Sequence, residues 1–194
     1  MLGIILCGGH SSRMGTDKGL MSHNDEIWAK LAGDKISGLD VPLAFSINET
    51  QRQSYAGLLN RDQLIIDLPE LDVNGPLRGV LSAHLENPSE DLFLLACDMV
   101  LMEGRLLRLL ADAYHEDNSF DAYIYKKGGE QEPLCGIYKA VGLEKIMHKI
   151  QTTGLEKHSM KFVLNQLSVC ELIVEELDYK CFMNFNAHAE INGL

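Results

Sequence analysis

Short apolar segments alternate with longer amphipathic segments from the beginning of the chain. Four apolar runs are almost uninterrupted by polar residues, which is typical of parallel strands buried on both faces. They are Leu2–Cys7, Pro42–Ile47, Leu64–Asp67 and Leu92–Cys97. The segments between them carry apolar residues at helical spacing, at Ile27–Ile36, Gln51–Leu59 and Leu77–Leu85. This alternation predicts right-handed βαβ units and a mostly parallel sheet with helices on both faces.

The second half of the chain continues with strands and helices in a different order. The predicted helices are Arg105–Tyr114, Leu143–Ile150, Met160–Leu167 and a short final one at Ala187–Ile191, and the predicted strands are Ala122–Tyr125, Pro133–Tyr138 and Val169–Val174. The first two of these strands flank the turn Lys127-Gly128-Gly129. Since no repeat, linker or low-complexity tract interrupts the pattern, we predict one α/β domain over residues 1–194, a three-layer α/β/α fold of the Rossmann-like kind.

The carboxyl ends of the predicted parallel strands carry the candidate chemistry. Ligands of open α/β sheets bind beyond these strand ends. The four strands end at Gly8 and Gly9, at Asn48, at Asp67 and at Asp98. Glycine or a polar residue at all four ends predicts one shared ligand site.

A glycine-rich loop, LCGGHSSRMGTDK from Leu6 to Lys18, follows the first strand. Its glycines let backbone N–H groups approach an anion, and Arg13 and Lys18 supply full positive charges. The spacing is neither that of a P-loop nor that of a dinucleotide-binding loop. We predict a phosphate-binding loop; the alternative is a glycine-rich turn with solvated basic residues.

Two further motifs extend this site. Asp98 ends a buried strand beside the predicted phosphate loop, where one carboxylate and phosphate oxygens suit Mg²⁺. Its alternative role is to cap the helix that begins near Glu103, or a turn before that helix. Gly75 followed by Pro76 is typical of a helix start, which can face an anion or a sugar hydroxyl, or can be a helix entry and nothing else.

Composition excludes several classes of partner. The formal net charge is -11, with 28 acidic and 17 basic residues, which disfavours nucleic acid or an anionic membrane as the main partner. Five cysteines without a C-x-x-C pair predict reduced thiols and a cytoplasmic protein. No apolar run has the length of a transmembrane helix, and the N-terminus lacks the basic region of a signal peptide.

Taken together and in this order, the motifs resemble those of the molybdenum cofactor guanylyltransferases. The most specific part is LCGGHSSRMGTDKGLM, with the pair Asp17 and Lys18. The segments NGPLRGVLSA, LLACDM, EPLCGIY and the terminal Asn184-Phe185-Asn186 follow in register. The resemblance implies a nucleotide-diphospho-sugar transferase fold. It also implies transfer of GMP from GTP to the phosphate of molybdenum-bound molybdopterin, with Mg²⁺ as cofactor.

The resemblance also assigns roles to individual residues. It implies nucleotide contacts at Leu6, Cys7, Gly8, Lys18, Asn48 and Asp67, and a magnesium and phosphate role at Asp98. The reasoning from the loop and the helix start adds Gly9 and Gly75 to the predicted nucleotide-binding set. Arg13 joins Asp98 and Lys18 as a predicted catalytic residue. Asp67 or Asn48 would suit recognition of guanine or ribose.

Three departures from the family pattern concern the acceptor more than the nucleotide. Val100 stands two residues after Asp98, where the family usually has proline. The segment 22–26 lacks the glycine and proline common in that loop. The region 133–167, where the pterin would bind, offers only generic residues such as Lys157 and Lys161.

The expected organisation is a nucleotide-binding half over about residues 1–100 and an acceptor-binding half over about 101–194. We expect a monomer or a weak oligomer, with a molybdoenzyme chaperone or other cofactor-synthesis proteins as plausible partners. Two other functions stay open from the sequence. One is a transferase of the same superfamily that uses CTP or a sugar phosphate, and the other is a nucleotide-binding regulator without turnover.

Overall fold

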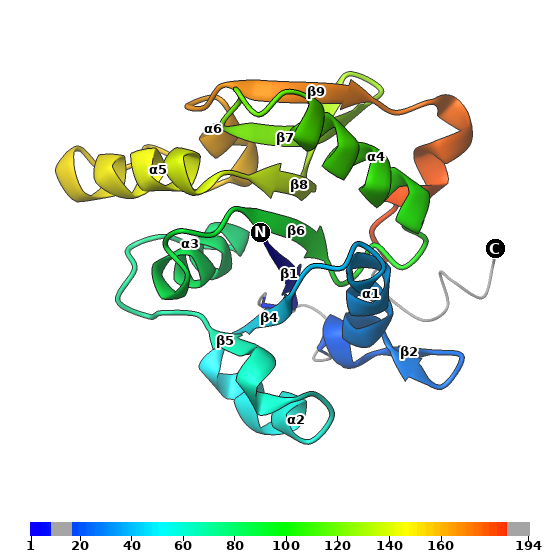
Figure 1. Ribbon diagram of the computed structural model, residues 1–194. Helices are drawn as coiled ribbons and strands as arrows, with labels where there is room; N and C mark the ends of the chain where they lie inside the picture. Colours follow the sequence, from blue (N-terminus) through cyan, green and yellow to red (C-terminus); the bar gives the residue numbers. More distant parts are fainter. Residues whose placement is uncertain (9–16, 186–194) are drawn as a thin grey trace.

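The computed structural model describes residues 1–8 and 17–185, which surround a seven-stranded sheet of order β5-β4-β1-β6-β8-β7-β9 (Figure 1). Its parallel part consists of β1 (Leu2–Leu6), β4 (Leu43–Ile47), β5 (Leu64–Ile66) and β6 (Leu92–Ala96). Each of these strands ends at or one residue before its predicted end. The predicted mostly parallel α/β sheet is therefore confirmed.

The rest of the sheet contains the antiparallel pairs. β8 (Glu130–Tyr138) runs antiparallel to both β6 and β7 (Ala122–Lys127), and β9 (Val169–Ile173) lies parallel to β7 at the edge. Gly128 and Gly129 join β7 to β8 with φ angles of 56° and 86°. A two-residue turn of this kind needs positive φ at both positions and can join only antiparallel strands.

Helices cover both faces of the sheet (Figure 1). α1 (Trp28–Ser37) and α4 (Gly104–Glu116) pack on one face. α3 (Pro76–Glu86), α5 (Ala140–Thr152) and α6 (Met160–Leu164) pack on the other. Adjacent strand residues point to opposite faces, so Ile4 and Ile5 are both fully buried but in different core clusters. This double burial explains why the strands are continuously apolar, and it confirms the predicted three layers.

Several short elements depart from the predicted pattern. The unpredicted ones are η1 (Lys18–Leu20), β2 (Ser22–His23), β3 (Glu26–Ile27), η2 (Glu49–Gln51), η3 (Arg61–Gln63) and η4 (Glu176–Phe182). α2 (Arg52–Ala56) is shorter than predicted because Gly57 forms its C-cap, and α6 also ends early. The predicted final helix at 187–191 lies outside the described residues. No helix within the described ranges has the length and apolar character needed to cross a membrane.

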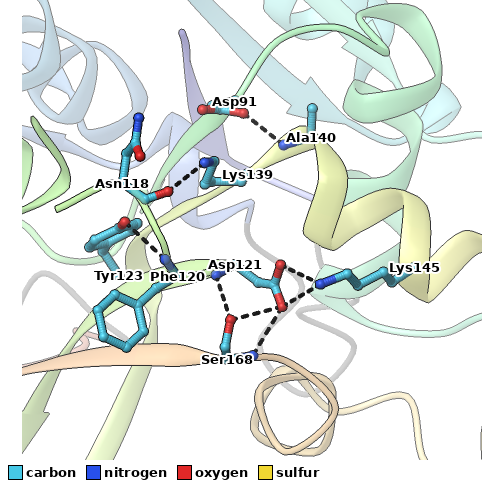
Figure 2. Close-up of polar contacts among 9 residues, drawn as sticks. All are labelled: Asp91, Asn118, Phe120, Asp121, Tyr123, Lys139, Ala140, Lys145 and Ser168. Atoms are coloured by element: carbon cyan, nitrogen blue, oxygen red, sulfur yellow. Dashed lines mark hydrogen bonds and ion pairs between the residues drawn. The ribbon is translucent and has the colours of Figure 1, made fainter.

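A polar network joins strands and helices at the amino ends of β6, β7 and β9, which is the end of the sheet opposite to the predicted ligand site (Figure 2). Asp121, which precedes β7, accepts hydrogen bonds from Lys145 Nζ at 2.7 and 2.9 Å. It also accepts bonds from the backbone N and the Oγ of Ser168 at 3.1 and 3.0 Å. Nearby, Asp91 accepts a bond from the backbone N of Ala140 at 2.8 Å. The network therefore fixes α5 and the beginnings of β7 and β9 relative to β6.

The electrostatics of Asp121 follow from these contacts. Desolvation acts to raise the pKa of this carboxyl, but hydrogen bonds from Lys145 and Ser168 outweigh it and lower the pKa below 3.8. A carboxylate with a lowered folded-state pKa stabilises the fold above its unfolded pKa. That contribution is lost as the pH falls through the folded-state value.

We expect Asp121→Asn to lower the free energy of unfolding at pH 7 by about 1–3 kcal/mol, because the acceptor of these buried hydrogen bonds loses its negative charge. The difference from the wild type should shrink as the pH falls below the unperturbed value of 3.8 and through the lower folded-state pKa, where the wild-type carboxyl becomes protonated. Urea unfolding at pH 7 and pH 3 measures both values. The exposed change Asp34→Asn in α1 is the control and should have little effect. A loss of stability that is the same at both pH values would contradict this account.

Candidate active site

The carboxyl edge of the parallel strands brings Lys18 next to Asp98. β1 and β6 are neighbours, and the backbone N of Cys97 donates to the Leu6 carbonyl at 3.2 Å, so the strand ends stay together. Lys18 Nζ lies 2.8 Å from Asp98 Oδ2, and the two side chains are 27% and 16% exposed. The predicted phosphate-binding cation and the predicted metal ligand, which lie 80 positions apart in sequence, thus meet at one point.

Asp98 does not act as the cap of the following helix. The N-cap of α4 is Glu103, and its side chain makes no capping hydrogen bond. Asp98 instead lies in the turn directly after β6, with its carboxylate held by Lys18. The helix-cap alternative is therefore wrong, and the carboxylate is left for another role.

Asp17 anchors the end of the glycine-rich loop. Its Oδ1 accepts hydrogen bonds from the Gly19 backbone N at 3.0 Å and from Tyr55 Oη at 2.9 Å. Its Oδ2 accepts a bond from Gln51 Nε2 at 2.6 Å, and the same Gln51 amide donates to the Cys7 carbonyl at 3.1 Å. Burial strongly raises the pKa of Tyr55, so its hydroxyl stays a donor. The network ties Lys18 to the end of β1.

Gln51 and Tyr55 are site-supporting residues that the sequence analysis missed. The pattern assigned them only to a helix, and they lie 34 and 38 positions from Asp17. A glutamine or tyrosine on a helix has no local feature that reveals such a partner. The burial of both side chains, 9% and 0% exposed, is the structural sign of their role.

Asp67 forms a second polar corner at the same sheet edge. Ser46 Oγ donates to Asp67 Oδ1 at 2.9 Å. Asp67 Oδ2 would lie 2.8 Å from a Cβ placed on Gly8, so the glycine permits this close approach. Burial raises the pKa of Asp67, while the Ser46 hydrogen bond and the positive charge of Arg78 act in the opposite direction. Among the described residues, Arg78 Nε is buried without a hydrogen-bond partner.

The other predicted residues occupy different positions. Asn48 caps η2, where its Oδ1 accepts bonds from Gln51 N at 3.2 Å and Thr50 Oγ1 at 2.5 Å. Gly75 is the N-cap of α3 with a φ of 67°, and this helix begins at the carboxyl edge of the sheet. Leu6 and Cys7 are each 6% exposed, so only their backbones could meet a ligand. Gly9 and Arg13 lie outside the described residues.

The five cysteines, all within the described ranges, are free thiols, as predicted. Hydrogen bonding to Cys7 and burial raise the pKa of Cys97, and burial raises that of Cys135. These two thiols therefore stay protonated and act as small core residues.

The donor set at Asp98 suits a magnesium ion. The described residues contain no cluster of three or more His, Cys, Asp or Glu side chains that could hold a metal ion. Mg²⁺ does not need one, because it takes one or two carboxylates together with water and substrate phosphate oxygens. Lys18 Nζ donates a hydrogen bond to Asp98 Oδ2, and no described residue donates one to Oδ1. One carboxylate beside Lys18, with an oxygen that accepts no hydrogen bond from any described residue, therefore fits Mg²⁺ that binds with a nucleotide.

The chain is similar in sequence and in fold to several known proteins. The family described as MobA-like NTP transferase domain matches residues 3–169. A probable molybdenum cofactor guanylyltransferase of Methanothermobacter thermautotrophicus is 30% identical over 190 residues, covering 94% of this chain and 92% of that protein. The molybdenum cofactor guanylyltransferase of Campylobacter jejuni is 29% identical over 188 residues, covering 96% and 91%. The crystal structure of molybdopterin-guanine dinucleotide biosynthesis protein A from Archaeoglobus fulgidus matches with a TM-score of 0.76 at 20% identity, covering 100% and 96%.

We expect Gly8→Ala to weaken GTP binding at least about tenfold, a loss of about 1.4 kcal/mol. The added methyl group would lie 2.8 Å from Asp67 Oδ2, and Ser46 restrains that carboxylate from moving away. Calorimetric titration with GTP and Mg²⁺ measures the change. Gly104→Ala is the matched control, since nothing lies within 4 Å of its added Cβ. Equal GTP affinity in the two variants would show that Gly8 does not border the nucleotide.

Proposed function

Because the chain belongs to the MobA-like NTP transferase domain family and is a nucleotidyltransferase, we propose that it transfers GMP from GTP to molybdenum-bound molybdopterin. The acceptor atom is an oxygen of the molybdopterin phosphate, and pyrophosphate leaves. The observation that carries the proposal is the contact of Lys18 and Asp98 at 2.8 Å, where two neighbouring parallel strands end. The names of the relatives from Methanothermobacter and Campylobacter support the choice of nucleotide and acceptor.

The Asp67 corner suits recognition of guanine. Guanine carries an exocyclic amino donor, and its O6 and N7 atoms are acceptors. Asp67 can accept from the donors of the base, while Arg78, whose Nε has no hydrogen-bond partner among the described residues, brings a guanidinium to the same corner. Asn48 is less suited, because its side-chain oxygen already caps η2. We therefore assign base recognition to Asp67, which lies next to Gly8, together with Arg78.

The proposed reaction is an in-line displacement at the α-phosphorus of GTP. An oxygen of the acceptor phosphate forms the new P–O bond, and the bond to the β-phosphate breaks. A phosphate dianion is already a competent nucleophile, so no general base is required. The protein contributes position and charge: Lys18 and Arg13 bind triphosphate oxygens, and the backbone amide of Gly9 helps to cradle them, since the Gly8 amide donates to the Ser46 carbonyl at 3.0 Å.

Asp98 is the residue that would hold Mg²⁺. When bound, the ion would neutralise negative charge on the α-phosphate. Lys18 lies close enough to Asp98 to contact the same phosphate group, so the carboxylate orients the ammonium as well. In this proposal Asp98 is a metal ligand, Lys18 is its charge partner, and neither carries a proton.

The remaining organisation follows from the sheet. We assign nucleotide binding to about residues 1–100 and acceptor binding to about 101–194 within one domain. The reversal of strand direction between β6 and β8 supports this division, because β8 begins at the same edge at which β6 ends. Of the two acceptor-side lysines named above, Lys161 pairs with Glu130 and Lys157 is exposed.

We place the protein in the cytoplasm as a monomer or weak oligomer, with a molybdoenzyme chaperone or cofactor-synthesis proteins as partners. The five free cysteines support a reducing compartment. The acidic net charge of -11 supports a function without nucleic acid or anionic lipid as a partner.

We expect Asp98→Ala to reduce GMP transfer by about 100-fold or more, because the charge on the α-phosphate is no longer balanced. The fold should survive, since Asp98 lies in a turn at the sheet edge. The assay is pyrophosphate release with GTP, Mg²⁺ and molybdopterin, with circular dichroism to check folding. Near-normal turnover in the folded variant would rule out this metal assignment. Wild-type protein that binds GTP but releases no pyrophosphate would point to a regulator.

GTP with Mg²⁺ should protect the protein against heat more than CTP or ATP does. Ligand at 100 times its Kd stabilises the folded state by about 2.7 kcal/mol, enough for a clear rise in Tm.

Arg78→Ala should reduce the preference for GTP, since guanine O6 and N7 lose a donor. Arg108→Ala, an exposed change in α4, serves as control. A preference for CTP in the wild type would contradict the guanylyl assignment.

A further inference from the structure

A segment near the C-terminus crosses the carboxyl edge of the sheet and ends beside Asp98. We call residues 174–185 the C-terminal strap; they follow β9 and include η4, in orange to red in Figure 1. The strap is attached along its length. Its contacts are Val174 N to Lys126 O at 3.0 Å, Arg105 to Asp178 in an ion pair, Gly128 N to Tyr179 Oη at 3.1 Å, and the Phe182 ring 5.0 Å from that of Tyr125.

The last described residue of the strap contacts the turn that carries Asp98. The backbone N of Phe185 donates to the Asp98 carbonyl at 3.1 Å. The Phe185 side chain is 1% exposed and packs with Met21 and Trp28 in a core cluster separate from the two main ones. Because the Phe185 ring is buried, the Phe185 backbone is restrained. The hydrogen bond therefore restrains the Asp98 carbonyl in turn.

The same small cluster reaches the Lys18 side of the site. Met21 N donates to the Lys18 carbonyl at 3.0 Å, and Trp28 N donates to the Met21 carbonyl at 2.8 Å. Val100, two residues after Asp98, packs against the cluster, and its carbonyl accepts a hydrogen bond from Lys35 Nζ. The cluster thus connects the Lys18 carbonyl with the Asp98 carbonyl and with Val100.

We propose that Phe185 is a positioning residue for Asp98, an inference that rests on the proposed role of Asp98 as metal ligand. Phe185 touches neither substrate nor metal; it acts through the Asp98 backbone and through the Met21 and Trp28 packing. A metal ligand in a turn must be held within about 0.5 Å of its productive place, and turns by themselves do not provide such precision. The strap and its buried ring supply that restraint.

The kinetic test compares Phe185→Ala with Leu143→Ala, which removes a fully buried side chain from α5 in a different core cluster. Both variants should lose stability. Only Phe185→Ala should lower kcat for GMP transfer, by on the order of 10- to 100-fold as expected for misplacement of about 1 Å. Its KM for GTP should stay close to the wild-type value, because Gly8, Asp67 and Arg78 are untouched. Phe185→Leu should recover most of the lost turnover.

A second measurement needs no substrate. Hydrogen exchange of the peptide covering residues 97–102 should accelerate in Phe185→Ala and stay at the wild-type rate in Leu143→Ala. Unchanged exchange of this peptide in Phe185→Ala, or equal falls in kcat for the two alanine variants, would overturn the proposal. Wild-type protein without any transfer activity would refute the proposed function instead, while the exchange rates would still decide whether Phe185 restrains the Asp98 turn.

Discussion

The ion pair between Lys18 and Asp98 is the contact on which the candidate site depends. It exists because β1 and β6 are hydrogen-bonded parallel neighbours, so the residues that follow them leave the sheet at the same edge. Both side chains are mostly shielded from water, which strengthens the attraction between opposite charges. In the proposed function, the lysine of the pair binds the triphosphate and the carboxylate holds its metal ion. In a protein of net charge -11, this local arrangement of charge matters more than the total.

Each partner of the pair is held by its own set of contacts. On the lysine side, Asp17 is bound by Gln51 and Tyr55, and Gln51 also binds the end of β1. On the aspartate side, the C-terminal strap ends on the Asp98 carbonyl through Phe185. Both sets connect the pair to well-packed elements. Catalysis by positioning and charge requires such rigidity, since the reaction proposed here uses no proton transfer by a side chain.

The two parts of the sheet contribute in different ways. The parallel part supplies the strand ends with Gly8, Asp67 and Asp98, which suit a nucleotide. The antiparallel part extends the same edge with β7 and β8 and supports the strap, and in the proposed function it binds the acceptor. The network around Asp121 fixes this second part from the opposite edge (Figure 2). Transfer between two bound molecules requires a fixed distance and orientation between the two binding surfaces. One continuous sheet provides both.

The sequence by itself determined the elements and the strand ends, because both depend on local properties. Strands buried on two faces must be apolar at every position, and only glycine or polar residues suit the ends where a ligand binds, so Gly8, Asp67 and Asp98 could be named in advance. Tertiary structure decided which of these residues meet and what supports them. Gln51 and Tyr55 reach Asp17, and Phe185 reaches Asp98, across long separations in the chain. Such contacts leave no local pattern, since a buried phenylalanine or a helical glutamine looks the same in sequence whatever it packs against. Asn48 shows the converse: a polar residue at a strand end that the fold uses to cap a turn of helix.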